Sequence, residues 1–144
     1  MNKIKMGFAL SLSFALAGCG ATPPACDDSA VTDTVLNIVL TQLRQANFTS
    51  VAVKNGVYDE MDYERAVQKQ DDNKLLKLVV DKVEANFPED HMDLEAIRTT
   101  DIDEEIAATG CAARLTGKNN ARMDLTYTAQ ETEDGDIWVE VYGL

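Results

Sequence analysis

The sequence contains a single histidine, His91, and lacks the motifs on which most hydrolytic and zinc sites depend. It has no Gly-x-Ser-x-Gly pentapeptide and no zinc-type Cys/His spacing, so a Ser-His-Asp or Cys-His site could use only His91. A metal at the loop of residues 89–93 would have no second ligand segment. The acidic loops 101–106 and 131–136 lack the glycine or the spacing of a calcium-binding EF-hand. We therefore expect no catalytic site, no metal and no cofactor.

Long apolar runs are also absent, except for one short stretch at the N-terminus. Residues 1–5 carry two lysines and no acid, and residues 6–18 form an uncharged stretch rich in Leu, Phe and Ala. This stretch is shorter than the roughly 20 apolar residues of a membrane-spanning helix. A basic start, a short apolar stretch and small residues at its end are typical of a secretory signal peptide.

The last residues of this stretch are Leu16, Ala17, Gly18 and Cys19, which resemble the lipobox of bacterial lipoproteins. The resemblance covers only the export signal. It implies that residues 1–18 are removed, that Cys19 carries lipid, palmitate included, and that residues 19–28 tether the protein to a membrane. Because residue 20 is Gly rather than Asp, the resemblance also implies, for enteric-type bacteria, the outer membrane, facing the periplasm. The alternative is an ordinary cleavable signal that happens to precede a cysteine.

Basic residues are scarce: 13 Lys and Arg stand against 25 Asp and Glu. Loss of the two lysines in the signal leaves 11 basic residues, and 11 − 25 gives the mature chain a formal charge of −14. Such a domain is repelled by nucleic acid and by anionic lipid headgroups. We expect no nucleic-acid partner. The charge serves either solubility or attraction of a basic protein.

Cysteines are few, and lipidation of Cys19 leaves only Cys26 and Cys111 in the mature chain. An even pair in an oxidising compartment usually forms a disulfide, which here would tie the first helix to the sheet. No Cys-x-x-Cys pair indicates a catalytic redox role.

Hydrophobic periodicity divides the mature chain into helices followed by strands. Apolar spacings of three and four predict helices over residues 29–46, within 60–70 and over 74–87, although 75–83 also admits a strand. Residues 47–58 are expected as a short strand or a loop. Alternation then predicts strands over 94–102, 111–115, 123–129 and 137–141. The predicted fold is α+β, with N-terminal helices packed on a C-terminal antiparallel β-meander of three to four strands, one disulfide, and a single periplasmic domain over residues 29–144.

The last two strands predict the surface best suited to a partner. If the apolar residues of the last strand face the helices, its alternate residues face the other way, opposite polar residues of the preceding strand. Exposed Trp and Tyr on a rigid sheet are favoured anchors of protein interfaces. The alternative is that another segment covers this face. The candidate partner-binding residues are Trp138, Glu140, Tyr142, Thr126 and Thr128.

These features favour a non-enzymatic protein-binding lipoprotein anchored to the outer membrane. One version is an inhibitor or immunity protein against a basic envelope-targeting enzyme, and another is an accessory protein of a secretion, conjugation or exclusion apparatus. Two alternatives belong to other classes. One is a lipid or small-molecule carrier, and the other is an enzyme acting on peptidoglycan or lipid through unpatterned carboxylates.

Overall fold

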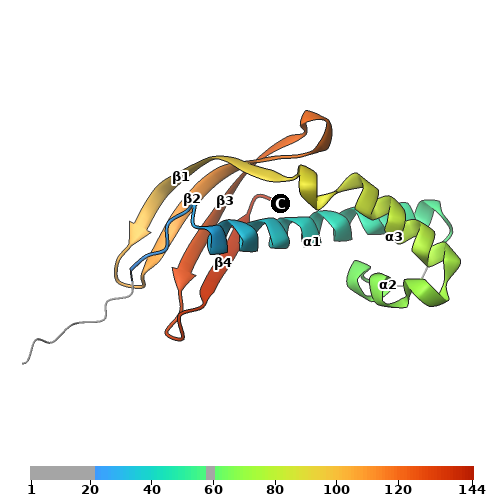
Figure 1. Ribbon diagram of the computed structural model, residues 1–144, viewed down its shortest axis with the longest axis horizontal. Coiled ribbons are helices and arrows are strands. Elements are labelled where there is room, and N and C mark those ends of the chain that lie inside the picture. Colours follow the sequence, from blue (N-terminus) through green and yellow to red (C-terminus); the bar gives the residue numbers. More distant parts are fainter. Residues whose placement is uncertain (1–21, 58–60) are drawn as a thin grey trace, which may run out of the picture.

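The computed structural model describes residues 22–57 and 61–144. In this part of the chain, α1 (Ser29–Lys54), α2 (Tyr63–Lys69) and α3 (Lys74–Asn86) precede β1 (Asp93–Asp103), β2 (Ala108–Thr116), β3 (Arg122–Glu131) and β4 (Ile137–Tyr142). The strands form one antiparallel sheet in the order β1-β2-β3-β4. Helix α1 lies across one face of this sheet (Figure 1). The predicted α+β fold, with N-terminal helices on a C-terminal meander, is confirmed.

Helix α1 begins where the sequence predicted. The carboxylate of Asp28 accepts a hydrogen bond from the backbone N–H of Ala30 at 2.8 Å, which satisfies a free donor of the first turn. Val31, Val35 and Val39 follow at spacings of four residues and are completely buried in the core formed with the sheet. Burial of this stripe fixes the first half of α1 on the sheet.

The end of α1 differs from the prediction. The strand or loop expected over residues 47–58 is wrong for residues 47–54, which continue α1 to Lys54; residue 58 lies outside the described residues. Phe48 and Ala52, one helical turn apart, are 2 % and 5 % exposed, so tertiary burial outweighs the β-branched composition of this segment. The Asn55-Gly56 pair ends the helix. Gly56 has a φ of +79°, a conformation that glycine adopts easily after a helix.

Two short polar caps begin the next helices. The carboxylate of Asp62 accepts a hydrogen bond from the N–H of Arg65 at 2.7 Å. The side-chain oxygen of Asn73 accepts bonds from the N–H groups of Leu75 and Leu76 at 3.0 and 3.1 Å. The helices predicted within residues 60–70 and over 74–87 are confirmed, although residue 60 lies outside the described residues.

Helix α1 joins two hydrophobic cores. The first contains Val31, Val35 and Val39 with the buried face of the sheet, and the second contains Phe48 and Ala52 with α2 and α3. Because a helix turns by roughly 100° per residue, these two stripes are offset by about 120° around α1. Figure 1 shows the sheet around one end of α1 and the shorter helices around the other. Among the described residues, no helix lies over the second face of the sheet.

Candidate partner-binding surface

The uncovered face of the sheet is built by alternation along β3 and β4. The register pairs Thr126 with Tyr142, Thr128 with Glu140 and Gln130 with Trp138, and residues paired in this way share a face. Trp138 is 59 % exposed and Tyr142 48 % exposed. No described helix or loop covers them, so the structure brings the five candidate residues together on one open surface. Their role in binding remains a prediction.

A side-chain hydrogen bond orders the middle of this surface. The Tyr142 hydroxyl donates to Oε2 of Glu140 at 2.6 Å. This bond fixes the aromatic ring and the carboxylate relative to each other, two residues apart on β4. A partner would therefore meet a preorganised aromatic and acidic pair, which lowers the entropy cost of binding.

Small residues of β2 form a trough beside Thr126 and Thr128. Ala112 and Gly110 pair with these threonines across β2 and β3, so they lie on the same face. A Cβ atom on Gly110 would lie 3.1 Å from the Thr100 hydroxyl oxygen, so the trough is narrow at this point. A hollow of about 380 Å³ lies over Gly110, and the residues that line it include Asp101, Asp103, Ile106, Thr126, Thr128 and Tyr142.

Acidic residues are concentrated at one end of the surface. The β1–β2 and β3–β4 turns lie at the same end of the meander, because β1 pairs with β2 and β3 pairs with β4 up to these turns. Residues 101–105 and residues 131–136 each contain four acids, and no Lys or Arg follows Arg122. At the opposite end of the trough, Arg114 pairs with Asp124 at 3.0 Å. The field at the turns therefore attracts a basic group.

The predicted disulfide is confirmed and lies beneath this surface. Cys26 and Cys111 are bonded, with their Cα atoms 5.7 Å apart. The Tyr127 hydroxyl donates to the Cys26 carbonyl oxygen at 2.7 Å, which fastens the same segment to β3. Burial, followed by the negative charge of Asp27, raises the pKa of Tyr127, so its hydroxyl stays protonated as this bond requires. The last residues of the predicted tether are thus fixed to the sheet.

The predicted lipidation site cannot be placed on this framework, because Cys19 and the signal peptide lie outside the described residues. The first described residues lie close to the β1–β2 end of the sheet (Figure 1). They lead into Cys26, which is bonded to Cys111 in the first half of β2. In the described part of the chain, no helix is both long and apolar enough to span a membrane. Within the same residues, no three His, Cys, Asp or Glu side chains converge as a metal site would require.

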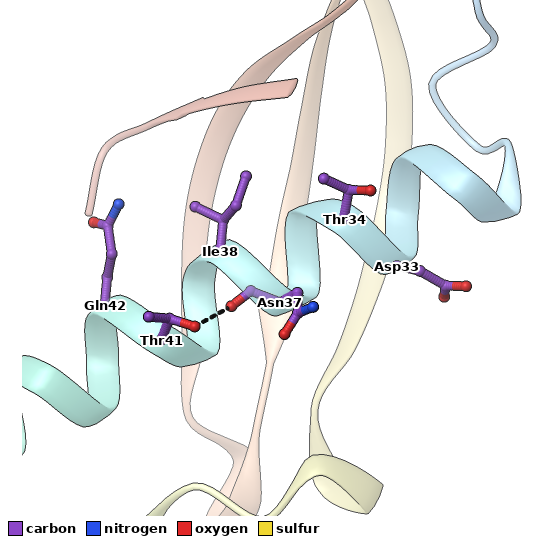
Figure 2. Close-up of a pocket in the computed structure, with 6 residues that line it drawn as sticks. All are labelled: Asp33, Thr34, Asn37, Ile38, Thr41 and Gln42. Carbon is purple, nitrogen blue, oxygen red and sulfur yellow. Dashed lines mark hydrogen bonds between the residues drawn. The ribbon is translucent and has the colours of Figure 1, made fainter. Parts of the chain in front are cut away.

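Helix α1 carries a hollow on its outward side that sequence reasoning missed. It measures about 510 Å³ and is lined by residues of one helix: Asp33, Thr34, Asn37, Ile38, Thr41 and Gln42. Figure 2 shows these side chains pointing in different directions rather than toward a common point. The Thr41 hydroxyl already donates to the Asn37 carbonyl oxygen at 2.8 Å. The only sequence signal is that residues 34–43 contain no charge, and the surface has no convergent groups to hold a ligand.

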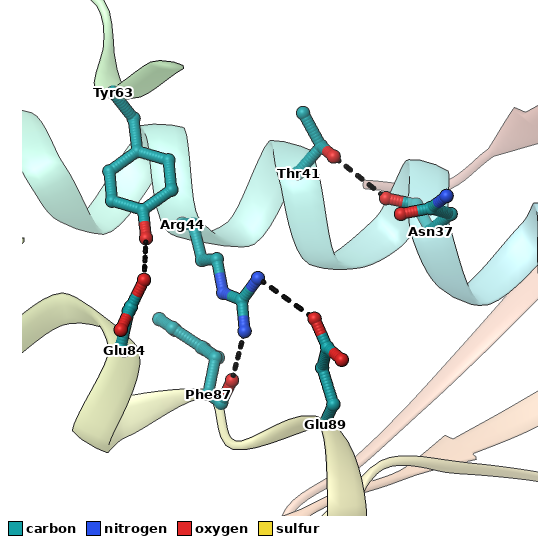
Figure 3. Close-up of polar contacts among 7 residues, drawn as sticks. All are labelled: Asn37, Thr41, Arg44, Tyr63, Glu84, Phe87 and Glu89. Atoms are coloured by element: carbon teal, nitrogen blue, oxygen red, sulfur yellow. Dashed lines mark hydrogen bonds and ion pairs between the residues drawn. The ribbon is translucent and has the colours of Figure 1, made fainter. Parts of the chain in front are cut away.

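A second feature missed from the sequence is the polar network where α1 meets α3 (Figure 3). Arg44 donates to the Phe87 carbonyl oxygen at 3.0 Å and pairs with Glu89 at 3.4 Å. The Tyr63 hydroxyl donates to Glu84 at 3.1 Å. Burial, together with this bond to Glu84, raises the pKa of Tyr63 to about 12. The sequence signal was the isolation of Arg44, the sole charged residue between Asp33 and Lys54. The network positions the two cores.

A smaller hollow of about 200 Å³ lies where the two cores meet, lined chiefly by apolar residues: Leu43, Phe87, Met92, Leu115 and Met123. Small-molecule sites usually measure about 300–1,000 Å³, so this hollow is small for a lipid. Comparisons of the chain with protein-family models, with curated proteins and with solved structures find no match.

Proposed function

We propose that this chain is a lipid-anchored envelope protein whose uncovered sheet face binds a basic protein. In this proposal Cys19 carries the lipid, the domain faces the periplasm from the outer membrane, and binding inhibits or neutralises a basic envelope-targeting enzyme. The observation that carries the proposal is the exposure of Trp138 and Tyr142, 59 % and 48 %, on a rigid sheet among acidic residues.

The chemistry of the surface supports a protein partner. Interface anchors are most often Trp, Tyr and Arg, and they work best when rigid neighbours exclude water around them. Trp138 and Tyr142 share one face of β4, and the bond from Tyr142 to Glu140 limits the freedom of the Tyr142 ring. The acids at the two turns would steer a basic protein toward them and raise its association rate.

The short tether supports action at the membrane surface. Six residues separate Cys19 from the disulfide-bonded Cys26, so the two cysteines are seven positions apart. Even fully extended, that segment reaches only about 25 Å. A lipid on Cys19 would therefore hold the acidic end of the sheet near the membrane, where an enzyme attacking the envelope would be met. The carrier alternative gains less support, because the junction hollow of about 200 Å³ is small for a lipid.

Capture of partners from envelope extracts tests this proposal. The bait is the chain from Gly20 onward with an affinity tag in place of the lipid, compared with the Trp138→Ala variant. Leu78→Ala is the matched control, because Leu78 is 46 % exposed but lies on α3, away from the sheet face. We expect one basic protein to be retained at low salt by the bait and the control. Trp138→Ala should reduce its retention at least tenfold.

The salt dependence of this capture separates the inhibitor version of the proposal from the other version, an accessory protein of an envelope apparatus. Charge-steered binding of a basic enzyme should weaken steeply as ionic strength rises, because screening shortens the reach of the acidic field. Retention of apparatus components that resists high salt would instead favour the accessory protein. Equal retention by Trp138→Ala and the bait would contradict both versions.

A further inference from the structure

The two edges of the sheet differ in how well they are protected against pairing with another strand. Along β1, the register shifts between Glu95 and Arg98 and again between Thr99 and Asp101. Ala96 in the first irregular stretch has a φ of +52°. Register shifts of this kind, together with charged residues such as Glu95 and Arg98 on the edge strand, hinder the addition of another strand. The β1 edge is therefore closed to a partner.

The β4 edge has none of these protections. Its pairing with β3 is regular from Ile137 to Tyr142, and Glu140 is its single charged residue. The strand contains no proline, and its β-branched and aromatic residues favour extended structure. A regular, largely apolar edge of this kind is a template for strand addition.

The β3–β4 turn shows which backbone groups of β4 are free. The N–H of Thr132 donates to the Asp136 carbonyl at 2.8 Å, so hydrogen-bonded pairs alternate with non-bonded pairs from this point. Trp138, Glu140 and Tyr142 then direct their N–H and C=O groups toward β3. The other residues of the strand direct theirs away from the sheet, and no hydrogen bond of the described residues reaches them. These are Ile137, Val139 and Val141.

Charge decides what can occupy this edge. Glu131, Glu133, Asp134 and Asp136 lie at or beside the β3–β4 turn, Glu140 lies within β4, and no Lys or Arg follows Met123. Pairing with a second copy would bring together two domains that are both strongly acidic, which is unfavourable. A strand rich in Lys or Arg would place opposite charges there.

We infer that β4 binds its partner by edge-to-edge strand addition, with an extended basic segment of the partner as the fifth strand. This inference rests on the proposed function and specifies how the basic partner is recognised. Residues of the segment beside Val139 and Val141 face α1 and are apolar. Alternate residues beside Trp138 and Tyr142 are Lys or Arg, which interact with Glu140 and with the aromatic faces.

The test uses the full-length chain in detergent micelles and a peptide of alternating lysine and valine. A peptide of the same composition with lysines and valines in separate blocks is the control. Hydrogen exchange measured by mass spectrometry should show saturable protection of the outward-facing amides of β4, those of Ile137, Val139 and Val141. The alternating peptide should give this protection and the block peptide should not. Val139→Pro removes an outward N–H and leaves the β3 ladder intact, so it should weaken binding about tenfold. Val139→Ala keeps the N–H and should bind more tightly than Val139→Pro.

Several results would overturn the inference. The first two are that the alternating peptide does not bind saturably, or that it binds without protecting the amides of β4. The other two are that the block peptide binds as tightly as the alternating one, or that Val139→Pro and Val139→Ala bind with equal affinity. Protection of β4 that grows with protein concentration in the absence of peptide would identify a second copy instead. If Val139→Pro fails to fold, the exchange data on the wild-type chain decide. One combination of results would reject strand addition and leave the proposed function standing. In it, Trp138→Ala loses the captured partner, but hydrogen exchange of β4 in the wild-type chain does not change when peptide is added.

Discussion

Removal of the Cys26–Cys111 disulfide is the perturbation whose magnitude the structure defines best. The bond closes a loop between residues 85 positions apart and joins the segment before α1 to the centre of β2. Loop-closure entropy for this separation corresponds to about 4–5 kcal/mol of unfolding free energy. Cys26 and Cys111 are 4 % and 1 % exposed. The double variant Cys26→Ala/Cys111→Ala is therefore preferred to serine, which would bury a hydroxyl at each position. A domain of this size has about 5–15 kcal/mol in total, so the variant should be marginally stable.

Urea unfolding followed by far-ultraviolet circular dichroism measures this loss directly. The control is Tyr127→Phe, which keeps the disulfide but removes the 2.7 Å hydrogen bond to the Cys26 carbonyl. That control should lose only about 0.5–1.5 kcal/mol. If the double variant also loses less than about 1 kcal/mol, the disulfide does not constrain the unfolded chain as argued, and packing of α1 alone holds the N-terminal segment.

Two further predictions concern the polar network between α1 and α3 and the lipid anchor on Cys19. The pKa of Tyr63 is raised to about 12. The free energy that its neutral hydroxyl contributes to folding should therefore be fully present below ~10, the pKa of an unfolded tyrosine, and be lost as pH rises through ~12. Tyr63→Phe should lack this part of the decline in urea unfolding at increasing pH, and an identical decline in both proteins would contradict the assignment. Cys19→Ser should move the protein from the membrane fraction to the soluble fraction and block lipid-dependent processing. Unchanged membrane retention would reject the lipid anchor.

The sheet and the caps could be predicted from sequence because their signals are local. Alternation from Met123 to Ala129 reports one buried face, and Asn73 lies where the first turn of α3 needs a hydrogen-bond acceptor. The two mature cysteines left one possible pairing. For the same reason the sequence grouped the candidate surface: the period of a strand decides which side chains share a face with Trp138.

The second half of α1 could not be predicted from the same kind of signal. Phe48 and Ala52 lie at helical spacing, but the buried stripe shifts by about 120° around the helix near Arg44, which breaks the periodicity of a single stripe. This second stripe is buried by contact with α2 and α3, which the sequence of α1 does not indicate. The trough over Gly110 was missed because it depends on the pairing of β2 with both of its neighbours. The hydrogen bond between Tyr142 and Glu140 requires side-chain conformations that the sequence does not specify.

The chain contains a single tryptophan, so one spectroscopic probe tests the proposed surface most directly. Labelling with 5-fluorotryptophan gives one fluorine resonance, which belongs to Trp138. On addition of the captured basic partner, that resonance should shift and lose its sensitivity to solvent, since the exposed indole becomes covered. The Leu78→Ala control should give the same response. Retention of the partner with an unchanged resonance would contradict the claim that the uncovered sheet face is the binding surface.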